Sequence, residues 1–230
     1  MTGSGEQAND DQVPAWARKT AGESRWAATA AVVAIILIQY YLPSQFTLGP
    51  RLLIPGLGLA LMLVLIAASP FRIDREEVWL RRASLFLTAV LSVAVAWSVD
   101  RLVIGLVDGS VSNDAAGLLV SGGAIWLTNV LVFGLAYWEF DRGGPAARAH
   151  ARKQYPDFLF VQMQSPAAAD PEWEPQFPDY LYLSFTNAAA FSPTDVMPMS
   201  RWAKFLMMIQ SGISLITMSL VIARAINVLK

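Results

Sequence analysis

The sequence predicts an all-α membrane protein: a polytopic helix bundle with five transmembrane helices and one short re-entrant or half helix before the last. Composition is the first reason, since 55% of the 230 residues are apolar and only 15% are charged, whereas soluble domains carry roughly 25% charged residues. The second reason is that the apolar residues are gathered into long runs, and about 20 such residues cross the hydrocarbon core of a bilayer.

Several other classes of protein are disfavoured. The net charge of −1 provides no basic field for nucleic acid, and the absence of cysteine excludes disulfides and thiolate metal sites. We find no nucleophile–base pattern, no metal-ligand spacing and no dinucleotide-binding fingerprint. We therefore expect no enzymatic activity, no cofactor and no metal site.

The first 25 residues are polar, mixed in charge and contain three glycines. They predict a mobile cytoplasmic tail. The first apolar run starts only at Trp26, and no convincing cleavage site of small residues follows it. We therefore interpret this run as a retained membrane span and not as a secretory signal.

Five apolar runs are interpreted as spans, and the first four form a transmembrane region over residues 26–140. Pro55 near the start of the second span predicts a kink, and Ser121-Gly-Gly123 in the fourth permits close approach of another helix. Asp100 and Arg101 predict an ion pair or interfacial anchor. The five runs are residues 26–42, 52–69, 83–106, 117–140 and 202–229.

Residues 141–178 form a Pro-rich charged loop, in which six prolines exclude a long helix. Its apolar stretch Phe158–Met163 predicts packing onto the membrane surface. Glu139, Asp141 and Arg142, at the end of the fourth span, are interpreted as an interfacial cluster.

The orientation follows from lysine and arginine in the loops, which are enriched on the cytoplasmic side. Three basic clusters lie in the N-terminal tail, after the second span and after the fourth, whereas the other short loops contain one basic residue or none. The sequence therefore predicts a cytoplasmic N-terminus and an external C-terminus.

Residues 179–230 contain a short helix and the last span. Tyr180–Ala190 is too short to cross a membrane. This segment resembles the pore module of potassium channels, in which a pore loop precedes an inner helix. The matching residues are Ser184, Phe185, Thr186, Asp195 and Pro198.

The departures from the potassium-channel pattern fall on the selectivity filter, where Ser192, Pro193 and Thr194 replace glycine, tyrosine and glycine. Glycine supplies the positive φ angles that aim filter carbonyls inward, and Pro193 fixes its own φ near −65°. We therefore expect no potassium selectivity of the usual kind. Ser192 to Asp195 instead predicts a helix start capped by Ser192; the alternative is that Thr194 and Asp195 form a polar ring at a pore mouth.

The layout also resembles a family of bacterial inner-membrane proteins known only as a domain of unknown function. That resemblance implies a multi-pass protein of the inner (plasma) membrane, without implying an activity. The residues that carry it are Asp179–Phe185, Thr194–Val196 and Ala223–Asn227.

Polar residues of the last span fall on one helix face, and they either hydrogen-bond to neighbouring helices or line a water-filled path. With the polar residues of the short segment they form the candidate pore-like set. Its members are Thr186, Asn187, Ser192, Thr194, Asp195, Gln210, Ser214 and Thr217.

The leading hypothesis is a membrane protein with a degenerate channel-like module that conducts or transports ions as an oligomer. The alternative is a non-conducting scaffold or partner-binding protein. The expected partners are the lipid bilayer and, for a conducting path, further copies of the chain, with no nucleic acid. The charge bias places the short segment on the cytoplasmic side, opposite to its place in potassium channels. The module is therefore inverted, as in ionotropic glutamate receptors, or the likeness is limited to a helical turn.

Overall fold

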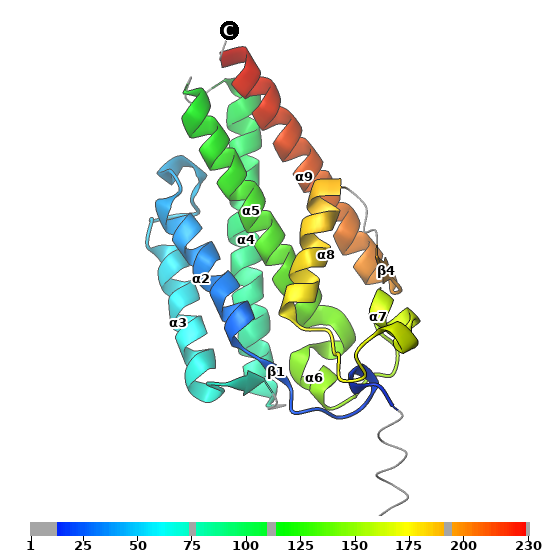
Figure 1. Ribbon diagram of the computed structural model, residues 1–230. Helices are drawn as coiled ribbons and strands as arrows, with labels where there is room; N and C mark the ends of the chain where they lie inside the picture. The colour runs from blue at the N-terminus through cyan, green and yellow to red at the C-terminus, as the bar shows by residue number, and fades with distance from the viewer. Residues whose placement is uncertain (1–12, 74–76, 110–113, 191–194, 229–230) are drawn as a thin grey trace, which may run out of the picture.

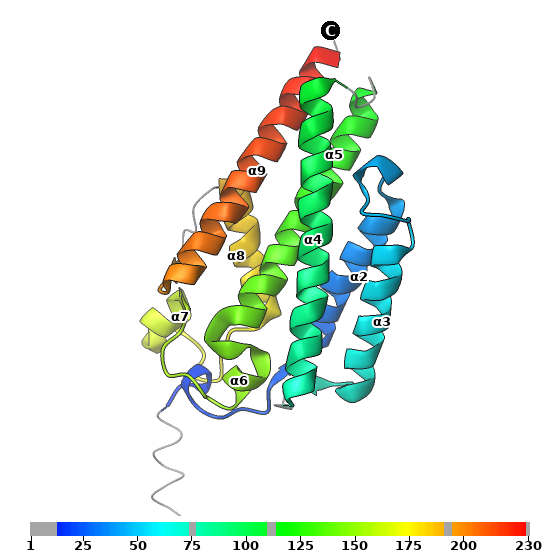
Figure 2. The same cartoon turned by 180° about the vertical axis from the view of Figure 1, so that it is seen from behind.

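The computed structural model describes residues 13–73, 77–109, 114–190 and 195–228, and it is mostly helical. Six helices longer than ten residues form the bundle shown in Figure 1, and Figure 2 shows it from behind. These helices are α2 (Trp26–Tyr41), α3 (Leu53–Ala68), α4 (Val78–Asp108), α5 (Ala115–Phe140), α8 (Phe177–Ala190) and α9 (Arg201–Val228).

Helix α5 is the centre of the bundle. It packs against α2 and α4 on one side and against α8 and α9 on the other, while α3 packs against α2 and α4 (Figure 1). One apolar core surrounds the lower half of α5 in Figure 1, and a smaller one near the opposite end joins Leu102, Ile125 and Val221. The large apolar side chains left exposed on α3, α4 and α9 suit a surface in contact with lipid.

Three of the helices are long and apolar enough to cross a membrane: residues Val78–Val107, Ala116–Gly143 and Arg201–Asn227. They lie where three of the spans were predicted. Helices α2 and α3 are apolar as well, but each has 16 residues, fewer than the about 20 that cross a bilayer core upright. The all-helical class is confirmed, and three candidate spans are found.

Two glycines of α5 allow its neighbours to approach closely. A Cβ atom on Gly122 would lie 2.6 Å from Val221 Cγ2 of α9, and one on Gly134 would lie 3.3 Å from the Leu181 Cα of α8. By contrast, a Cβ on Gly123 would meet no described atom within 4 Å. The close approach predicted for Ser121–Gly123 therefore depends on Gly122 alone.

Residues 13–25 were expected to belong to a mobile tail, but they are packed against the bundle. Ala15 is buried, and its N–H donates to the Pro171 carbonyl at 2.9 Å. Strand β1 (Glu23–Ser24) pairs antiparallel with β2 (Arg72–Ile73). Composition did not indicate this because the segment is polar overall, and its contacts are made mainly through backbone groups and a few apolar side chains.

The connection after α5 contains only short elements, as its prolines predicted. They are η3 (Asp141–Gly143), α6 (Pro145–Ala149), β3 (Phe158–Phe160), α7 (Val161–Gln164) and η4 (Pro166–Ala168). The predicted packing of Phe158–Met163 onto the membrane surface is wrong for its largest side chains. Phe158 is fully buried in the protein, with its ring centroid 5.1 Å from that of Tyr137 and 5.6 Å from that of Trp202.

Helix α8 is the short helix expected before the last span. Its 14 residues give it a length of about 21 Å at 1.5 Å per residue. Strand β4 (Val196–Pro198), which follows it in the sequence, pairs antiparallel with β3. Because β3 precedes α8 and β4 precedes α9, the chain returns to the end of the bundle from which α8 starts (Figure 1).

Candidate functional site

A cluster of polar side chains joins α5, α8 and α9, and we call it the polar seam. Each member is buried except Ser211, which is half-buried, and each hydrogen-bonds to a side chain of another helix. The cluster contains three residues of the predicted pore-like set. Its members are Asn129 and Tyr137 of α5, Ser184 and Asn187 of α8, and Gln210, Ser211 and Ser214 of α9.

Gln210 is the hub of the polar seam, and its side chain has no exposed surface. Its Nε2 donates to the Ser184 carbonyl at 3.0 Å and to the Ser184 Oγ at 2.6 Å. Its Oε1 accepts from the Tyr137 hydroxyl at 2.6 Å and from Asn187 Nδ2 at 2.8 Å. The amide therefore has two donated and two accepted hydrogen bonds, which is its full capacity.

Asn187 is bound on both sides of its amide as well. Its Nδ2 also donates to the Met207 carbonyl at 3.0 Å, and its Oδ1 accepts from Ser211 Oγ at 3.1 Å. One turn further along α9, Asn129 Nδ2 donates to Ser214 Oγ at 3.1 Å. The polar face predicted for the last span is thus turned toward α5 and α8 of the same chain.

The other predicted pore-like residues do not join the polar seam. Thr186 Oγ1 donates within its own helix, to the carbonyls of Tyr182 and Leu183 at 3.0 Å. Thr217 is buried, and its hydroxyl has no hydrogen-bond partner among the residues that the structure describes. Ser192 and Thr194, and with them the predicted helix start, lie outside the described residues.

Asp195 is half-buried and lines a small cavity of about 160 Å³ together with Asp179 of α8. Its Oδ1 has no hydrogen-bond partner within the described part of the chain. The Asp179 carboxylate accepts the Gln176 N–H at 2.8 Å, which caps the start of α8. Asp195 therefore lies near the first turns of α8, apart from the polar seam.

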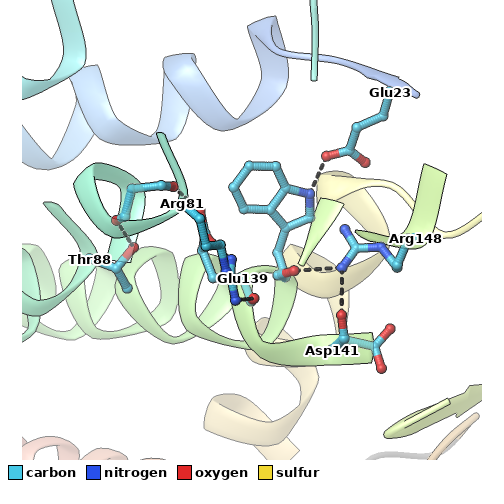
Figure 3. A network of polar contacts seen from close by, with 8 residues as sticks. Glu23, Arg81, Thr88, Glu139, Asp141 and Arg148 are labelled. Carbon is cyan, nitrogen blue, oxygen red and sulfur yellow. Dashed lines mark hydrogen bonds and ion pairs between the residues drawn. The ribbon is translucent and has the colours of Figure 1, made fainter. Parts of the chain in front are cut away.

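A second polar cluster, which sequence reasoning missed, lies at the lower end of the bundle (Figure 3). Glu139, near the end of α5, is 1% exposed and forms an ion pair with Arg81 of α4. Arg81 Nη2 also donates to the Glu139 backbone carbonyl at 2.5 Å, and Ser84 donates to the carboxylate. Glu139 was interpreted as interfacial, but its charge is buried and compensated by α4.

Arg148 of α6 closes the same end of α5. Its Nη1 donates to the backbone carbonyls of Trp138 at 2.6 Å and Asp141 at 3.1 Å (Figure 3), and its guanidinium lies 4.9 Å from the ring centroid of Tyr180. Burial alone would lower the pKa of Arg148, but the neighbouring Tyr180, Glu23 and Asp141 raise it above its ordinary value. Arg148 is therefore a permanently charged cap on the carboxyl end of α5.

Asp141 and Asp157 tie the connection to α8 and α9. The Tyr180 hydroxyl of α8 donates to Asp141 Oδ2 at 2.5 Å, and the Asp157 N–H donates to Asp141 Oδ1 at 2.9 Å. Asp157 Oδ1 in turn accepts from Trp202 Nε1 of α9 at 2.9 Å. Asp141 and Arg142 are fully buried, so the interfacial cluster predicted from the sequence is an internal network.

Glu23 joins this end from the N-terminal segment. Its carboxylate accepts the Trp138 indole N–H (Figure 3) and is 5% exposed. Burial raises the pKa of Glu23 to about 7, although the Arg148 charge and the Trp138 hydrogen bond both lower it. Glu23 is thus a carboxyl group that titrates near neutral pH.

A partly enclosed cavity of about 670 Å³ opens beside the Arg81–Glu139 pair. It lies between the last turns of α3, the first turns of α4, the end of α5 and the start of α6. Its described lining has a charged part and an apolar part, the latter including Leu65, Val78 and Leu80. The charged residues are Arg25, Glu77, Arg81, Arg82, Glu139 and Arg152.

Little in the sequence could have revealed the pairing of Arg81 with Glu139, because 58 positions separate the two residues. The available signal was three ionisable residues in direct continuation of an apolar span, since charges at membrane depth need partners. Comparison with known proteins adds no further constraint: no protein-family model, curated protein or solved structure matches this chain.

Proposed function

We propose that this chain is a multi-pass membrane protein in which α8 and α9 form a locked, non-conducting module, so that the protein serves as a membrane scaffold. The observation that carries this proposal is the amide of Gln210, whose full hydrogen-bonding capacity is used within one chain. A residue that lines a conducting path keeps polar groups available to water or ions. Gln210 keeps none.

The proposal includes five crossings, with α8 as a re-entrant helix. Helices α2 and α3 each extend about 24 Å at 1.5 Å per residue, and a bilayer thins locally around a short span at modest cost. Tyr40 and Tyr41 at the end of α2 are exposed, as interfacial aromatic residues are. Irregular backbone at the tip of α8 is tolerated at membrane depth where protein surrounds it.

The proposed orientation has the N-terminus in the cytoplasm of a bacterial cell. The ends of the helices that carry most of the basic residues lie together at the bottom of Figure 1, where α2, α4 and α9 start and α3 and α5 end. Arg81, Arg82, Arg201 and Lys204 belong to this end, whereas Arg51 is the basic residue of the connection between α2 and α3. This bias is the positive-inside pattern.

The test uses the absence of cysteine from the chain. Single cysteines at Ser214 and Thr217 should resist a charged, membrane-impermeant thiol reagent in sealed vesicles. Ser44→Cys and Gln154→Cys, at exposed positions in connections, should react from opposite sides and thereby report the orientation.

Ion flux into proteoliposomes completes the test. We expect no flux above that of protein-free vesicles for Na⁺, K⁺ or Cl⁻. Flux that is blocked when the reagent modifies Ser214→Cys or Thr217→Cys would overturn the scaffold and establish the conducting alternative. Reaction of Ser44→Cys and Gln154→Cys from the same side would overturn the proposed crossings.

A further inference from the structure

We propose that the 670 Å³ cavity between α3, α4, α5 and α6 is a binding site for the phosphate headgroup of an anionic phospholipid. The lipid would belong to the leaflet at the basic end of the bundle. The inference concerns a part of the molecule separate from the polar seam, and it does not depend on whether the seam conducts.

The charge of the cavity favours an anion. Among its described lining residues, four arginines face two glutamates, which leaves a net charge of +2. One arginine and one glutamate are already paired with each other, because Arg81 binds Glu139. Arg25, Arg82 and Arg152 are left to balance Glu77. Arginine suits phosphate, since its planar guanidinium donates two parallel hydrogen bonds to two oxygens.

Arg25 provides an independent observation. It lies directly before α2, and its Nε is buried yet has no hydrogen-bond partner among the residues that the structure describes. Buried donors are nearly always satisfied. A phosphate oxygen in the cavity would accept from this N–H, which is not engaged by any described group of the protein.

The shape of the site is fixed by residues that do not need the ligand. Gly144 has φ of +98°, and a Cβ there would lie 2.3 Å from Arg81 Nη1. The absence of a side chain at Gly144 therefore allows Arg81 to reach both the carboxylate and the carbonyl of Glu139. The arginine pair is preorganised, which reduces the entropy lost on binding.

The apolar lining indicates that the ligand is amphiphilic. Leu65 belongs to the last turns of α3, and Val78 and Leu80 to the first turns of α4. These turns are the ends of apolar helices, where the headgroup region of a bilayer meets its hydrocarbon. Basic pockets between transmembrane helices at this depth bind anionic lipid headgroups, and the volume is within the range of small-molecule sites, about 300–1,000 Å³.

The experiment is a lipid titration of the full-length protein in neutral detergent, followed by native mass spectrometry. The probes are dioleoyl phosphatidylglycerol, dioleoyl phosphatidylcholine and soluble glycerol phosphate. We expect phosphatidylglycerol to bind at least tenfold more tightly than phosphatidylcholine. Arg25→Gln and Arg82→Gln should each weaken phosphatidylglycerol binding about tenfold, as expected for the loss of a charge-assisted hydrogen bond.

Arg201→Gln is the matched control, because Arg201 is exposed at the same basic end and does not line the cavity. It should bind phosphatidylglycerol as the unmodified protein does. An equal loss in Arg201→Gln and Arg82→Gln would show general surface attraction and overturn the site. Glycerol phosphate that binds as tightly as the lipid would overturn the assignment to a lipid. Arg82 is exposed, so its variant carries the test if Arg25→Gln misfolds.

Discussion

Gln210 of α9 and Ser184 of α8 are joined by two hydrogen bonds from one amide nitrogen, at 3.0 Å to the Ser184 carbonyl and 2.6 Å to its hydroxyl. The Ser184 hydroxyl donates in turn to the Val130 carbonyl of α5 at 2.6 Å. Three helices are thus linked through one serine. Because the carbonyl of Ser184 belongs to the backbone of α8, the position of α8 is fixed along α9 as well as its distance from it.

Replacement of Gln210 by leucine should destabilise the protein by about 2 kcal/mol. The substitution keeps the approximate volume but leaves the Tyr137 hydroxyl and the Asn187 amide without their acceptor, and each unsatisfied buried group costs about 1–3 kcal/mol. Hydrogen bonds between membrane helices contribute less, about 0.6 kcal/mol on average, which moderates the expected loss. Unfolding in sodium dodecyl sulfate measures it.

The matched control for that substitution is Ser219→Leu, which makes a polar-to-leucine change at an exposed position of α9. Its stability should change by less than about 0.5 kcal/mol, as is usual for surface positions. Equal losses in the two variants would contradict a structural role of the polar seam.

Gly122 and Gly123 are adjacent on α5 but should respond differently to alanine. Gly122→Ala places a methyl group 2.6 Å from Val221 Cγ2, and such overpacking costs about 1–3 kcal/mol. Gly123→Ala meets no described atom within 4 Å and should gain up to about 1 kcal/mol from helix propensity. Val221→Ala should partly rescue Gly122→Ala. A loss of stability in Gly123→Ala that matches Gly122→Ala would contradict this packing.

Glu23 should make stability depend on pH between about 4.5 and 7. Burial raises its pKa in the folded state to about 7 from an ordinary value of 4.5, so the folded state holds the proton more tightly than the unfolded state. The stabilisation is fully present below pH 4.5 and is lost as the pH rises through 7, by about 3 kcal/mol in total at 1.36 kcal/mol per pKa unit.

Glu23→Gln removes the titrating group and keeps an oxygen that can accept from the Trp138 indole. The difference in unfolding free energy between the unmodified protein and this variant, measured from pH 4.5 to 8, should therefore fall with increasing pH. Parallel pH profiles for the two proteins would show that Glu23 does not titrate in this range.

The long helices could be predicted from the sequence because each is specified locally by a run of apolar residues. Helices α4, α5 and α9 lie where spans were expected. The polar face of α9 was also visible, because Gln210, Ser214 and Thr217 recur at helical spacing. Its use in packing, instead of in a water-lined path, required the partners Asn187 and Ser184 on another helix.

The basic end of the bundle could not be predicted, since its contacts join residues far apart in the sequence. Glu139 is compensated by Arg81, and Asp141 by the Tyr180 hydroxyl and the Asp157 amide. From position alone, charges that follow an apolar span are expected at the membrane interface. The buried network arises because the proline-rich connection folds back under α5 and encloses them.

The final prediction concerns the asymmetry of the Arg81–Glu139 pair. The side chain of Glu139 is 1% exposed, whereas that of Arg81 is 32% exposed and borders the cavity. Arg81→Gln leaves a buried carboxylate without its partner and should cost about 3–5 kcal/mol. Glu139→Gln leaves an arginine that can reach water, so its loss should be smaller. The double variant should be more stable than Arg81→Gln alone, because it removes the uncompensated charge.

Unfolding in sodium dodecyl sulfate compares the three variants with Arg101→Gln, which breaks the exposed pair with Asp100. Exposed ion pairs contribute about 0–1 kcal/mol, so this control should remain close to the unmodified protein. If Arg81→Gln and Glu139→Gln lost the same stability, or if the double variant lost the sum of both, burial of Glu139 would not govern the pair. The expected order of stability, from highest to lowest, is Arg101→Gln, Glu139→Gln and Arg81→Gln, because the cost of an unpaired charge grows with its distance from water.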